Sequence, residues 1–332
     1  MYEQIDQLVN IDYNNRSIDR LYVEARKNTQ QPLTLKAAHM IEAIPKNRFV
    51  FFATGALARG WVSKKIGETD GPLGTAALAR AIRESRDAIP VIFIEESLIN
   101  TVKPILRAAG LCVVTLEEAL SANNQAEKGY TSIACVLPFP SDEKSAKLKV
   151  EFLIEELKPA AVICIEKTGM NTCGVYHNMK GHDYSEGYAK IDFLIQKARN
   201  LGIPTIGIGD GGNEIGMASV HEAIRKYVPY GGECQCGCGG GISSSTETDL
   251  LITGSVSNWA CYAVCASLAI KTRNLNLLHT VERERLMLKA AVAAGNVDGV
   301  NGMASTSVDG FSEDTNLAIV ELLSALVNKE LS

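Results

Sequence analysis

The sequence predicts an α/β fold in which a mostly parallel sheet carries helices on both faces. Short apolar runs rich in β-branched residues alternate with amphipathic stretches through most of the chain. Several runs, such as AAVICIE at 160–166, are continuously apolar, which is typical of strands buried on both sides. Beyond residue 253 only helical periodicity remains. Together these observations indicate a Rossmann-like three-layer arrangement with a helical C-terminal part.

The elements follow in order along the chain. Residues 1–47 predict a helical lead-in, with helices over 17–26 and 33–44. Apolar runs predict strands over 48–53, 90–94, 111–115, 132–137, 160–165, 204–208 and 249–253. Apolar spacings of three and four predict helices over 74–86, 97–109, 142–157, 186–200, 213–227, 258–272, 280–294 and 312–328. No repeat or linker composition interrupts them, so 48–332 is predicted to be a single large α/β domain.

Composition excludes several classes of protein. With 332 residues, of which 46% are hydrophobic, the chain can bury a sizeable core. The net charge of 33 − 38 = −5 gives no basic footprint for nucleic acid or an anionic membrane. No apolar run reaches the length of a membrane span, and the start MYEQIDQLVN does not resemble a secretory signal. We expect a cytoplasmic protein that acts on a small molecule, and a homo-oligomer is left open.

The nine cysteines are interpreted mainly as free thiols of a reducing compartment. Cys234, Cys236 and Cys238, in ECQCGCGGG, could bind a soft metal, but they lack C-x-x-C spacing and a recognisable partner pair. We therefore expect a glycine-rich loop without a stoichiometric metal. His177 and His182 are interpreted as surface or loop histidines. The cysteines that lie inside apolar segments are expected to be buried: Cys112, Cys135, Cys164, Cys261 and Cys265.

Two long segments lack helical or strand periodicity, and long loops of this kind are usually functional or mobile. Residues 167–185 are rich in Gly, Asn, Thr and Tyr, and residues 229–248 are rich in Gly, Cys and Ser. Both follow predicted elements of the same sheet, so they could meet over its edge.

Carboxylates follow the ends of several predicted strands, where open parallel sheets bind ligands. Glu68 and Asp70 come after the first strand and, two apart in an extended segment, can face one ligand. Glu166 ends the fifth strand, where a carboxylate needs a partner such as Lys167, a metal or a substrate ammonium. These residues and those after the sixth strand are predicted to converge in one acidic cleft.

The segment after the sixth strand, G-I-G-D-G-G-N-E-I-G, contains a G-x-G-x-x-G match at Gly207, Gly209 and Gly212. Asp210 inside that turn would repel a pyrophosphate, so no nucleotide cofactor is expected. Asp210 and Glu214 are four apart and are predicted to share one face at a helix N-terminus. Hard oxygen ligands favour Mg²⁺, Mn²⁺ or Ca²⁺ there, and capping of the helix is the alternative.

Four motifs together resemble the D-glutamate cyclase C-terminal-domain family over roughly residues 35–325. They are E-T-D-G-P at 68–72, the strand-end Glu166 followed by Y-x-N-M-x-G at 176–181, G-D-G-G-N-E-I-G at 209–216 and V-S-N-W at 256–259. The family often has E-R-P-G after its glutamate strand, whereas this chain has E-K-T-G at 166–169 and lacks that arginine. The resemblance implies cyclisation of D-glutamate to 5-oxo-D-proline with loss of water.

The implied site has three sets of residues. Glu166 is the expected base, with Asp210 and Asn178 as the other catalytic residues. A divalent metal, Mg²⁺ or Mn²⁺ and otherwise Ca²⁺, is expected at Glu68, Asp70, Asp210 and Glu214. Substrate is expected to contact Asn213, Ser257, Asn258, Gly211 and Gly212. Two other functions use the same residues: a metal-dependent phosphatase or other hydrolase acting on a phosphate ester, and a non-catalytic protein that binds a metal or an acidic amino acid.

Overall fold

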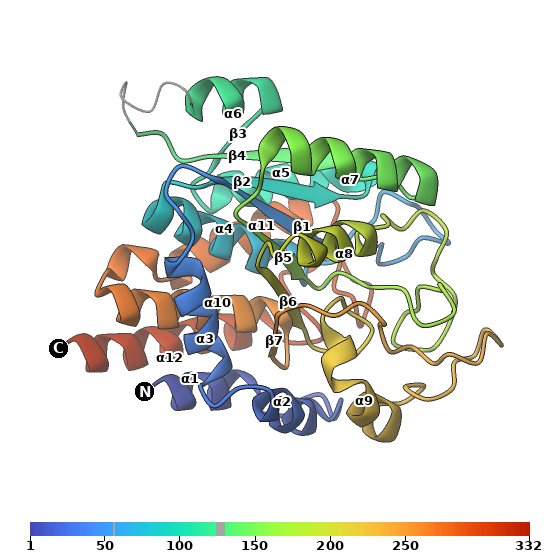
Figure 1. Cartoon of the computed structure of the whole chain (residues 1–332). Helices are drawn as coiled ribbons and strands as arrows, with labels where there is room; N and C mark the ends of the chain where they lie inside the picture. Colours follow the sequence, from blue (N-terminus) through green and yellow to red (C-terminus); the bar gives the residue numbers. More distant parts are fainter. Residues whose placement is uncertain (56, 124–129) are drawn as a thin grey trace.

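The computed structural model describes residues 1–55, 57–123 and 130–332, and it contains one sheet of seven parallel strands (Figure 1). The strands are β1 (Phe49–Thr54), β2 (Ile89–Ile94), β3 (Cys112–Val114), β4 (Ile133–Pro138), β5 (Ala161–Ile165), β6 (Thr205–Gly209) and β7 (Leu250–Thr253). The seven predicted strands are thereby confirmed, with ends that differ by at most one residue. None of the helices in the described ranges has both the length and the apolar character needed to cross a bilayer.

Helices cover both faces of the sheet, as predicted (Figure 1). One apolar cluster joins strand residues such as Phe51 and Phe93 to helices on one face, and another joins Val50 and Phe52 to helices on the other. Neighbouring strand residues thus enter opposite cores, which explains the continuously apolar runs. The first face carries α6 (Leu116–Asn123), α7 (Glu143–Leu157) and α8 (Asp192–Asn200). The second carries α4 (Pro72–Arg86), α5 (Ile99–Ala108), α10 (Ser257–Thr272), α11 (Val281–Ala293) and α12 (Glu313–Leu331).

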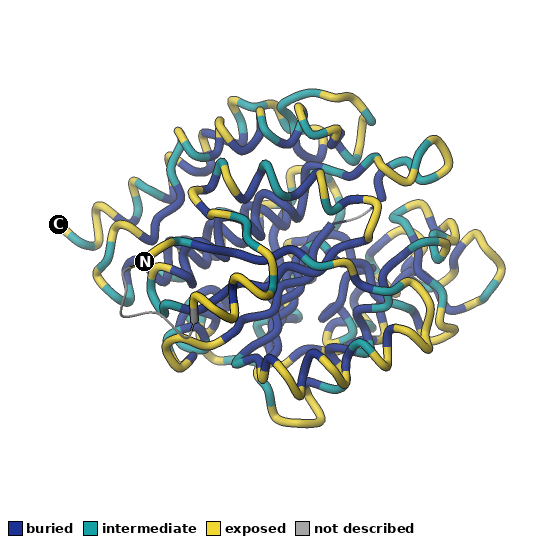
Figure 2. Tube along the Cα trace, turned by 90° about the horizontal axis from the view of Figure 1, so that it is seen from above, coloured by how far each residue is buried: buried dark blue, intermediate teal, exposed yellow. Residues whose placement is uncertain are grey.

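Helix α10 belongs to the second core, and its residues 257–270 are all buried. Figure 2 shows that the buried part of the chain lies in the middle of the molecule and that exposed residues lie around it. Trp259 and Tyr262 are both essentially inaccessible to solvent. Their polar atoms donate hydrogen bonds to Asn316 and Glu284, at 2.8 and 2.7 Å, so burial leaves neither unpaired. Four of the five cysteines predicted to be buried are buried. Cys112 is exposed, because β3 is an edge strand.

The N-terminal helices pack against the edge of the sheet near β7. They are α1 (Tyr2–Val9), which the sequence analysis did not predict, α2 (Ile18–Lys27) and α3 (Leu33–Glu42). The backbone N–H of Ser255 donates to the carbonyl of Val9 at 2.7 Å, and Thr253 donates to the side chain of Asn10 at 2.7 Å. These contacts bring the loop between α1 and α2, which carries Arg16, to the carboxyl end of the sheet.

Two helix predictions were wrong at their starts. Helix α8 begins at Asp192 rather than at residue 186, and the helical stretch predicted from residue 213 begins only with a 3-10 turn (Met217–Val220) and α9 (His221–Tyr227). Gly212 and Gly216 have φ of 119° and 104°, values that a right-handed helix cannot contain. Asp210 and Glu214 therefore do not share a helix face; they belong to a tight turn.

The strand order is β3-β4-β2-β1-β5-β6-β7. The chain forms β1 to β4 on one side of the sheet, with β4 between β2 and the edge strand β3, and then returns to β5, beside β1, to form the other side. Open α/β sheets bind ligands in the crevice where the direction of winding reverses, at the carboxyl ends of the strands. Here that point lies beyond β1 and β5. The order of the strands in the sheet could not be predicted from the sequence.

Candidate active site

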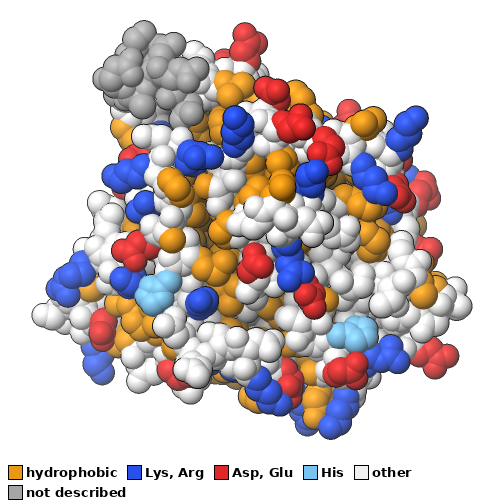
Figure 3. All heavy atoms as spheres, viewed as in Figure 1, with side chains coloured by type: hydrophobic (Ala, Val, Ile, Leu, Met, Phe, Trp, Pro, Cys, Tyr) orange, Lys and Arg blue, Asp and Glu red, His pale blue; other side chains and the backbone are white. Residues whose placement is uncertain are grey.

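A cavity of about 350 Å³ opens at this reversal point. Residues from five segments line it. Three of these segments follow the strands β1, β5 and β6, and the other two are the α1–α2 loop and the segment before α12. On the molecular face drawn in Figure 3, acidic and basic side chains are interspersed rather than gathered into one large patch. The charged residues and asparagines that line it are Arg16, Arg59, Glu68, Glu166, Asn178, Lys180, Asp210, Asn213 and Asp309.

Two carboxylates that line this cavity, Glu166 and Asp210, meet a third, Asp70, which is buried beside them and does not itself line the cavity. Asp70, Glu166 and Asp210 each offer one oxygen, and these oxygens lie within 4.8 Å of one another. Glu68 lines the same cavity. The convergence predicted from strand ends is therefore found, and a group of buried carboxylate oxygens this close could hold a hard divalent cation.

Asp70 is fixed against the first turn of α10. Its Oδ1 accepts hydrogen bonds from the N–H groups of Gly71 and Asn258, and its Oδ2 accepts one from Ser257, at 2.9 to 3.0 Å. The Asn258 side chain in turn accepts bonds from Gly71 and Gly74 at 2.9 and 2.6 Å. Asn258, which was expected to contact substrate, thus joins the 68–72 turn to α10 from beneath the cavity.

Glu166 stands where β5 turns away from the sheet, with a left-handed φ of 50°. Its Oε2 accepts a hydrogen bond from the Ser257 hydroxyl at 2.6 Å. Lys167, considered above as its partner, instead pairs with Glu95 and is fully buried. That candidate pairing is wrong, because the sharp turn at Glu166 directs Lys167 away from the cavity. The Glu166 carboxylate is left without a lysine partner.

Arg16 places a positive charge against two carboxylates of the site, which the sequence analysis did not predict. Its Nη1 lies 2.7 Å from Asp210 and 2.7 Å from Asp309, so one guanidinium joins two carboxylates. Burial lowers the pKa of Arg16, but Asp210 and Asp309 outweigh it and raise the pKa above its ordinary value. Arg16 lies in a loop 194 positions before Asp210, and Asp309 follows no strand; the turn dipeptide Asp309-Gly310 is its only sequence signal.

Negative charge exceeds positive charge in the cavity. Burial is the largest cause that raises the pKa of Glu68, Glu166 and Asp210 well above the ordinary range, and repulsion by Asp309, Glu214 and Glu166, respectively, adds to it. Burial, followed by repulsion from Asp309, raises the pKa of Asp70 to about 8 although three backbone N–H groups oppose the shift. Without a further cation, these groups share protons at neutral pH.

Glu214 holds the turn that presents Asp210. Its Oε1 accepts hydrogen bonds from the N–H groups of Asp210 and Gly211 at 2.9 and 2.7 Å, and its Oε2 accepts one from Gly212 at 2.6 Å. The two glycine N–H groups, expected to face substrate, are thus directed at Glu214. Gly211 also permits a close approach of Met179, since a Cβ there would lie 2.5 Å from the Met179 sulfur.

Asn178 and Asn213 reach the cavity from two different loops. The Nδ2 of Asn213 donates to the carbonyl of His177 at 2.7 Å, and its Oδ1 is buried with no hydrogen-bond partner among the described residues. The side-chain oxygen of Asn178 accepts bonds from Lys180 and His182, both at 3.0 Å. Asn213 thus lines the cavity and carries a buried acceptor that has no partner among the described residues, and such an acceptor favours a nearby donor.

Comparisons with known proteins assign the chain to a family. The sequence profile described as "D-glutamate cyclase-like, C-terminal" matches residues 5–324. The chain belongs to this family. It is also 24% identical, over an alignment of 345 residues, to a Homo sapiens protein named "D-glutamate cyclase, mitochondrial". That alignment covers 92% of this chain and 48% of the human protein, so the chain spans about half the length of this relative. The family match includes Arg16, upstream of the resemblance noted from the motifs.

Glu214→Gln tests whether this residue of the D-glutamate cyclase-like fold holds the turn or binds a cation. We expect the free energy of unfolding to fall by about 1.5–3 kcal/mol, because the glutamine amide would turn an N–H₂ toward backbone N–H groups. Denaturant unfolding measures this, with the exposed Glu222→Gln on α9 as control. Unchanged stability together with lost Mn²⁺ affinity would instead make Glu214 a metal ligand.

The raised carboxylate pKa values predict how the stability of this family member depends on pH. The pKa of Asp70 is 3.8 in its ordinary state and about 8 in the folded protein. Between these two pH values the folded state therefore binds the proton more tightly than the unfolded state. Stability is therefore highest near pH 4 and falls as pH rises toward 8. In a chelator, the melting temperature should decrease over this range, and Mg²⁺ or Mn²⁺ should raise it most at high pH.

The control for this experiment is Glu68→Gln, which removes one carboxylate from the cluster and should flatten the pH dependence. Melting temperatures that do not change with pH in the chelator would contradict the shared-proton description of the cavity.

Proposed function

We propose that this chain cyclises D-glutamate to 5-oxo-D-proline with loss of water, as a lyase of the hydro-lyase type, with help from Mg²⁺ or Mn²⁺. The observation that carries the proposal is a cavity of about 350 Å³ lined by Arg16, Glu166 and Asp210, with Asp70 buried beside the two carboxylates, in a member of a D-glutamate cyclase-like family. This volume is at the lower end for small-molecule sites and is suited to an amino acid.

The reaction places clear demands on such a site. The substrate ammonium must lose protons so that its nitrogen can attack the γ-carboxylate carbon. A C–N bond forms, one C–O bond breaks, and the two protons lost from nitrogen leave with the oxygen as water. The chemistry is difficult because the ammonium is not a nucleophile and a carboxylate is a poor electrophile. A positioned base and stabilisation of the developing oxyanion answer these two difficulties.

We assign the base to Glu166. One of its oxygens is held by Ser257, so the other can take a proton from an amine in the cavity. Burial and repulsion raise its pKa, and a nearby cation lowers the pKa again toward the working pH, where a general base is most effective. Asn213 Oδ1 is placed to accept a hydrogen bond from the same amine.

Asp70 and Asp210, with Glu68 beside them, would hold the divalent cation. When bound, that cation polarises the γ-carboxylate as a Lewis acid and offsets the negative charge of site and substrate. The N–H groups of Arg16 other than Nη1 make no hydrogen bond with the described residues, and they are assigned to a substrate carboxylate. Glu214, which was expected to bind the metal, is instead assigned to hold the turn at residues 210–212.

A single panel tests the proposal on this chain alone. The purified protein is incubated with D-glutamate, L-glutamate or a chromogenic phosphate ester, each with Mn²⁺ and with a chelator. We expect 5-oxoproline from D-glutamate only when the cation is present. Phosphate release without 5-oxoproline would indicate a metal-dependent phosphatase. A D-glutamate-induced rise in melting temperature without turnover would indicate a non-catalytic binding protein.

The cellular location is a separate proposal. All nine cysteines are free thiols, which fits a reducing compartment such as the cytoplasm. The human relative carries "mitochondrial" in its name, so fractionation of cells expressing the full gene product should compare both compartments. Recovery mainly in the mitochondrial fraction would overturn the cytoplasmic assignment.

A further inference from the structure

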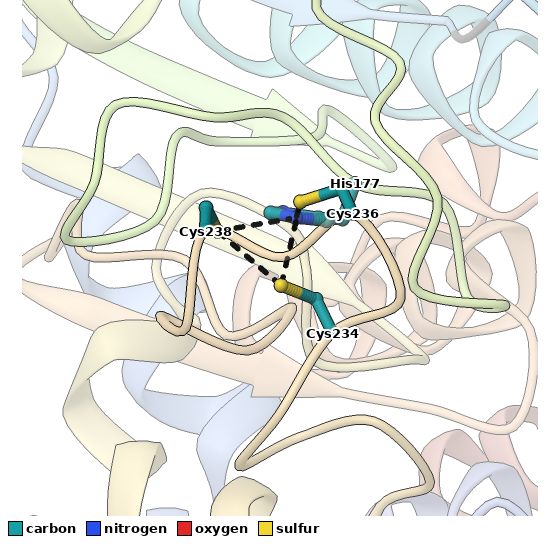
Figure 4. Close-up of side chains that lie close together, drawn as sticks. All are labelled: His177, Cys234, Cys236 and Cys238. Atoms are coloured by element: carbon teal, nitrogen blue, oxygen red, sulfur yellow. Dashed lines mark hydrogen bonds between the residues drawn. The ribbon is translucent and has the colours of Figure 1, made fainter.

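Three cysteines and one histidine meet on the side of the molecule where the two long loops come together (Figure 4). Cys234 Sγ lies 3.4 Å from Cys236 Sγ and 3.2 Å from Cys238 Sγ. His177 Nε2 lies 3.2 Å from Cys236 Sγ and 3.8 Å from Cys238 Sγ. Of the two expected positions for His177, surface or loop, the loop position is found, but the residue is only 1% exposed and so is not a surface histidine.

The distances between these sulfur and nitrogen atoms are close to those between the ligands of a tetrahedral metal ion. The four ligand atoms all lie within 4.8 Å of one another. A zinc ion with Zn–S bonds of about 2.3 Å and a Zn–N bond of about 2.0 Å separates its tetrahedral ligands by about 3.5–3.8 Å. The closest contacts, 3.2 Å, need only a few tenths of an ångström of opening. Three thiolates and an imidazole are a donor set that selects zinc over hard cations.

The local backbone and one side chain position the Cys238 thiol in this group. Gly237 and Gly239, on either side of Cys238, have φ of 81° and 77°, so the chain turns sharply on both sides of Cys238. The side chain of Asn171 donates to Cys238 Sγ at 3.3 Å and to the carbonyl of Gly241 at 2.8 Å. Hydrogen bonds of this kind to sulfur orient metal ligands. Of the two His177 ring nitrogens, Nε2 faces the thiols, and Nδ1 makes no hydrogen bond with described residues.

We propose that His177, Cys234, Cys236 and Cys238 bind one structural Zn²⁺ per chain. The sequence analysis expected no metal because it found no partner for the cysteines, and the fold supplies that partner from a loop 57 positions before Cys234. With four protein ligands the site is closed, which is the pattern of structural rather than catalytic zinc. It is distinct from the carboxylate cavity, whose oxygen ligands suit Mg²⁺ or Mn²⁺.

The zinc would fasten the loop that forms one wall of the cavity. His177 is followed directly by Asn178 and Met179, which line the cavity, and its carbonyl accepts the hydrogen bond from Asn213. The backbone bond from Gln235 to Gly181, at 2.8 Å, is a second link between the same two loops. Loss of zinc is therefore expected to loosen this wall as well as the cysteine loop.

Elemental analysis of protein purified without chelator should find about one zinc per chain. Cys236→Ser and His177→Ala should each lose most of it. Cys173→Ser is the matched control, because this exposed thiol donates to the backbone of Cys238 at 3.3 Å without joining the cluster, and its zinc content should equal that of the wild type. Asp210→Asn should also keep the zinc, which separates this site from the proposed cation in the cavity.

Wild-type protein gives a second measurement in case the ligand variants fold poorly. Exchange of zinc for Co²⁺ should produce the intense visible absorption of tetrahedral cobalt and the near-ultraviolet bands of thiolate coordination. A zinc-free wild type after equilibration with Zn²⁺, zinc content unchanged in Cys236→Ser, or a Cys234–Cys238 disulfide in the unreduced native protein would each overturn the proposal. None of these readouts depends on D-glutamate turnover, so failure of the proposed reaction leaves this test intact.

Discussion

Replacing Glu166 by glutamine is expected to lower the turnover of D-glutamate by about 10²–10⁴-fold while the protein remains folded. Glutamine keeps the shape of the side chain, and its carbonyl oxygen can still accept the hydrogen bond from the Ser257 hydroxyl. It cannot take a proton from the substrate ammonium at neutral pH. Removing one of several mutually repelling buried carboxylates should also leave the melting temperature unchanged or raised.

Two measurements make this prediction specific to a base. 5-Oxoproline formation gives the loss of turnover, and the rise in melting temperature on adding Mn²⁺ reports whether the cation still binds. We expect that rise to persist in Glu166→Gln. Its disappearance would make Glu166 a metal ligand instead of the base, and unchanged turnover would remove it from the chemistry. Glu186→Gln, at an exposed glutamate paired with Lys64, is the control for the substitution itself.

Asp210→Asn is expected to lower metal-dependent turnover by at least roughly two orders of magnitude, which corresponds to about 3 kcal/mol in the barrier. Asparagine retains the shape but not the charge that a divalent cation requires. Arg16 keeps its other partner, Asp309, so the melting temperature without metal should stay close to that of the wild type. The Mn²⁺-induced rise in melting temperature should be reduced or lost.

Asp309→Asn is the matched control for Asp210, because both carboxylates lie 2.7 Å from the same Arg16 nitrogen. Only Asp210 belongs to the three-carboxylate group, so Asp309→Asn should retain most of the Mn²⁺ response. If both variants lose turnover equally and keep the Mn²⁺ response, Asp210 acts only by holding Arg16. Unchanged turnover in Asp210→Asn would remove it from the catalytic assignment.

Local pattern was sufficient for the strands and insufficient for parts of the helices. A strand such as β5 is recognisable because its residues are apolar on both faces, which follows from the composition of the strand itself. The helix expected from residue 213 fails because Glu214 bonds backward to three N–H groups and two glycines take positive φ. Such side-chain-to-backbone bonds compete with a helix without disturbing its apolar periodicity.

The sequence by itself determined that carboxylates after β1, β5 and β6 would gather, because parallel strands all end at the same edge of a sheet. Only the tertiary structure decided what surrounds them. Arg16 meets Asp210 across 194 positions and Asp309 across 293, and His177 meets Cys236 across 59. These contacts depend on strand order and on the packing of loops, which hydrogen bonds and buried area between distant segments select. No local periodicity carries that information, so the arginine of the cavity and the histidine of the cysteine cluster became visible only in the folded chain.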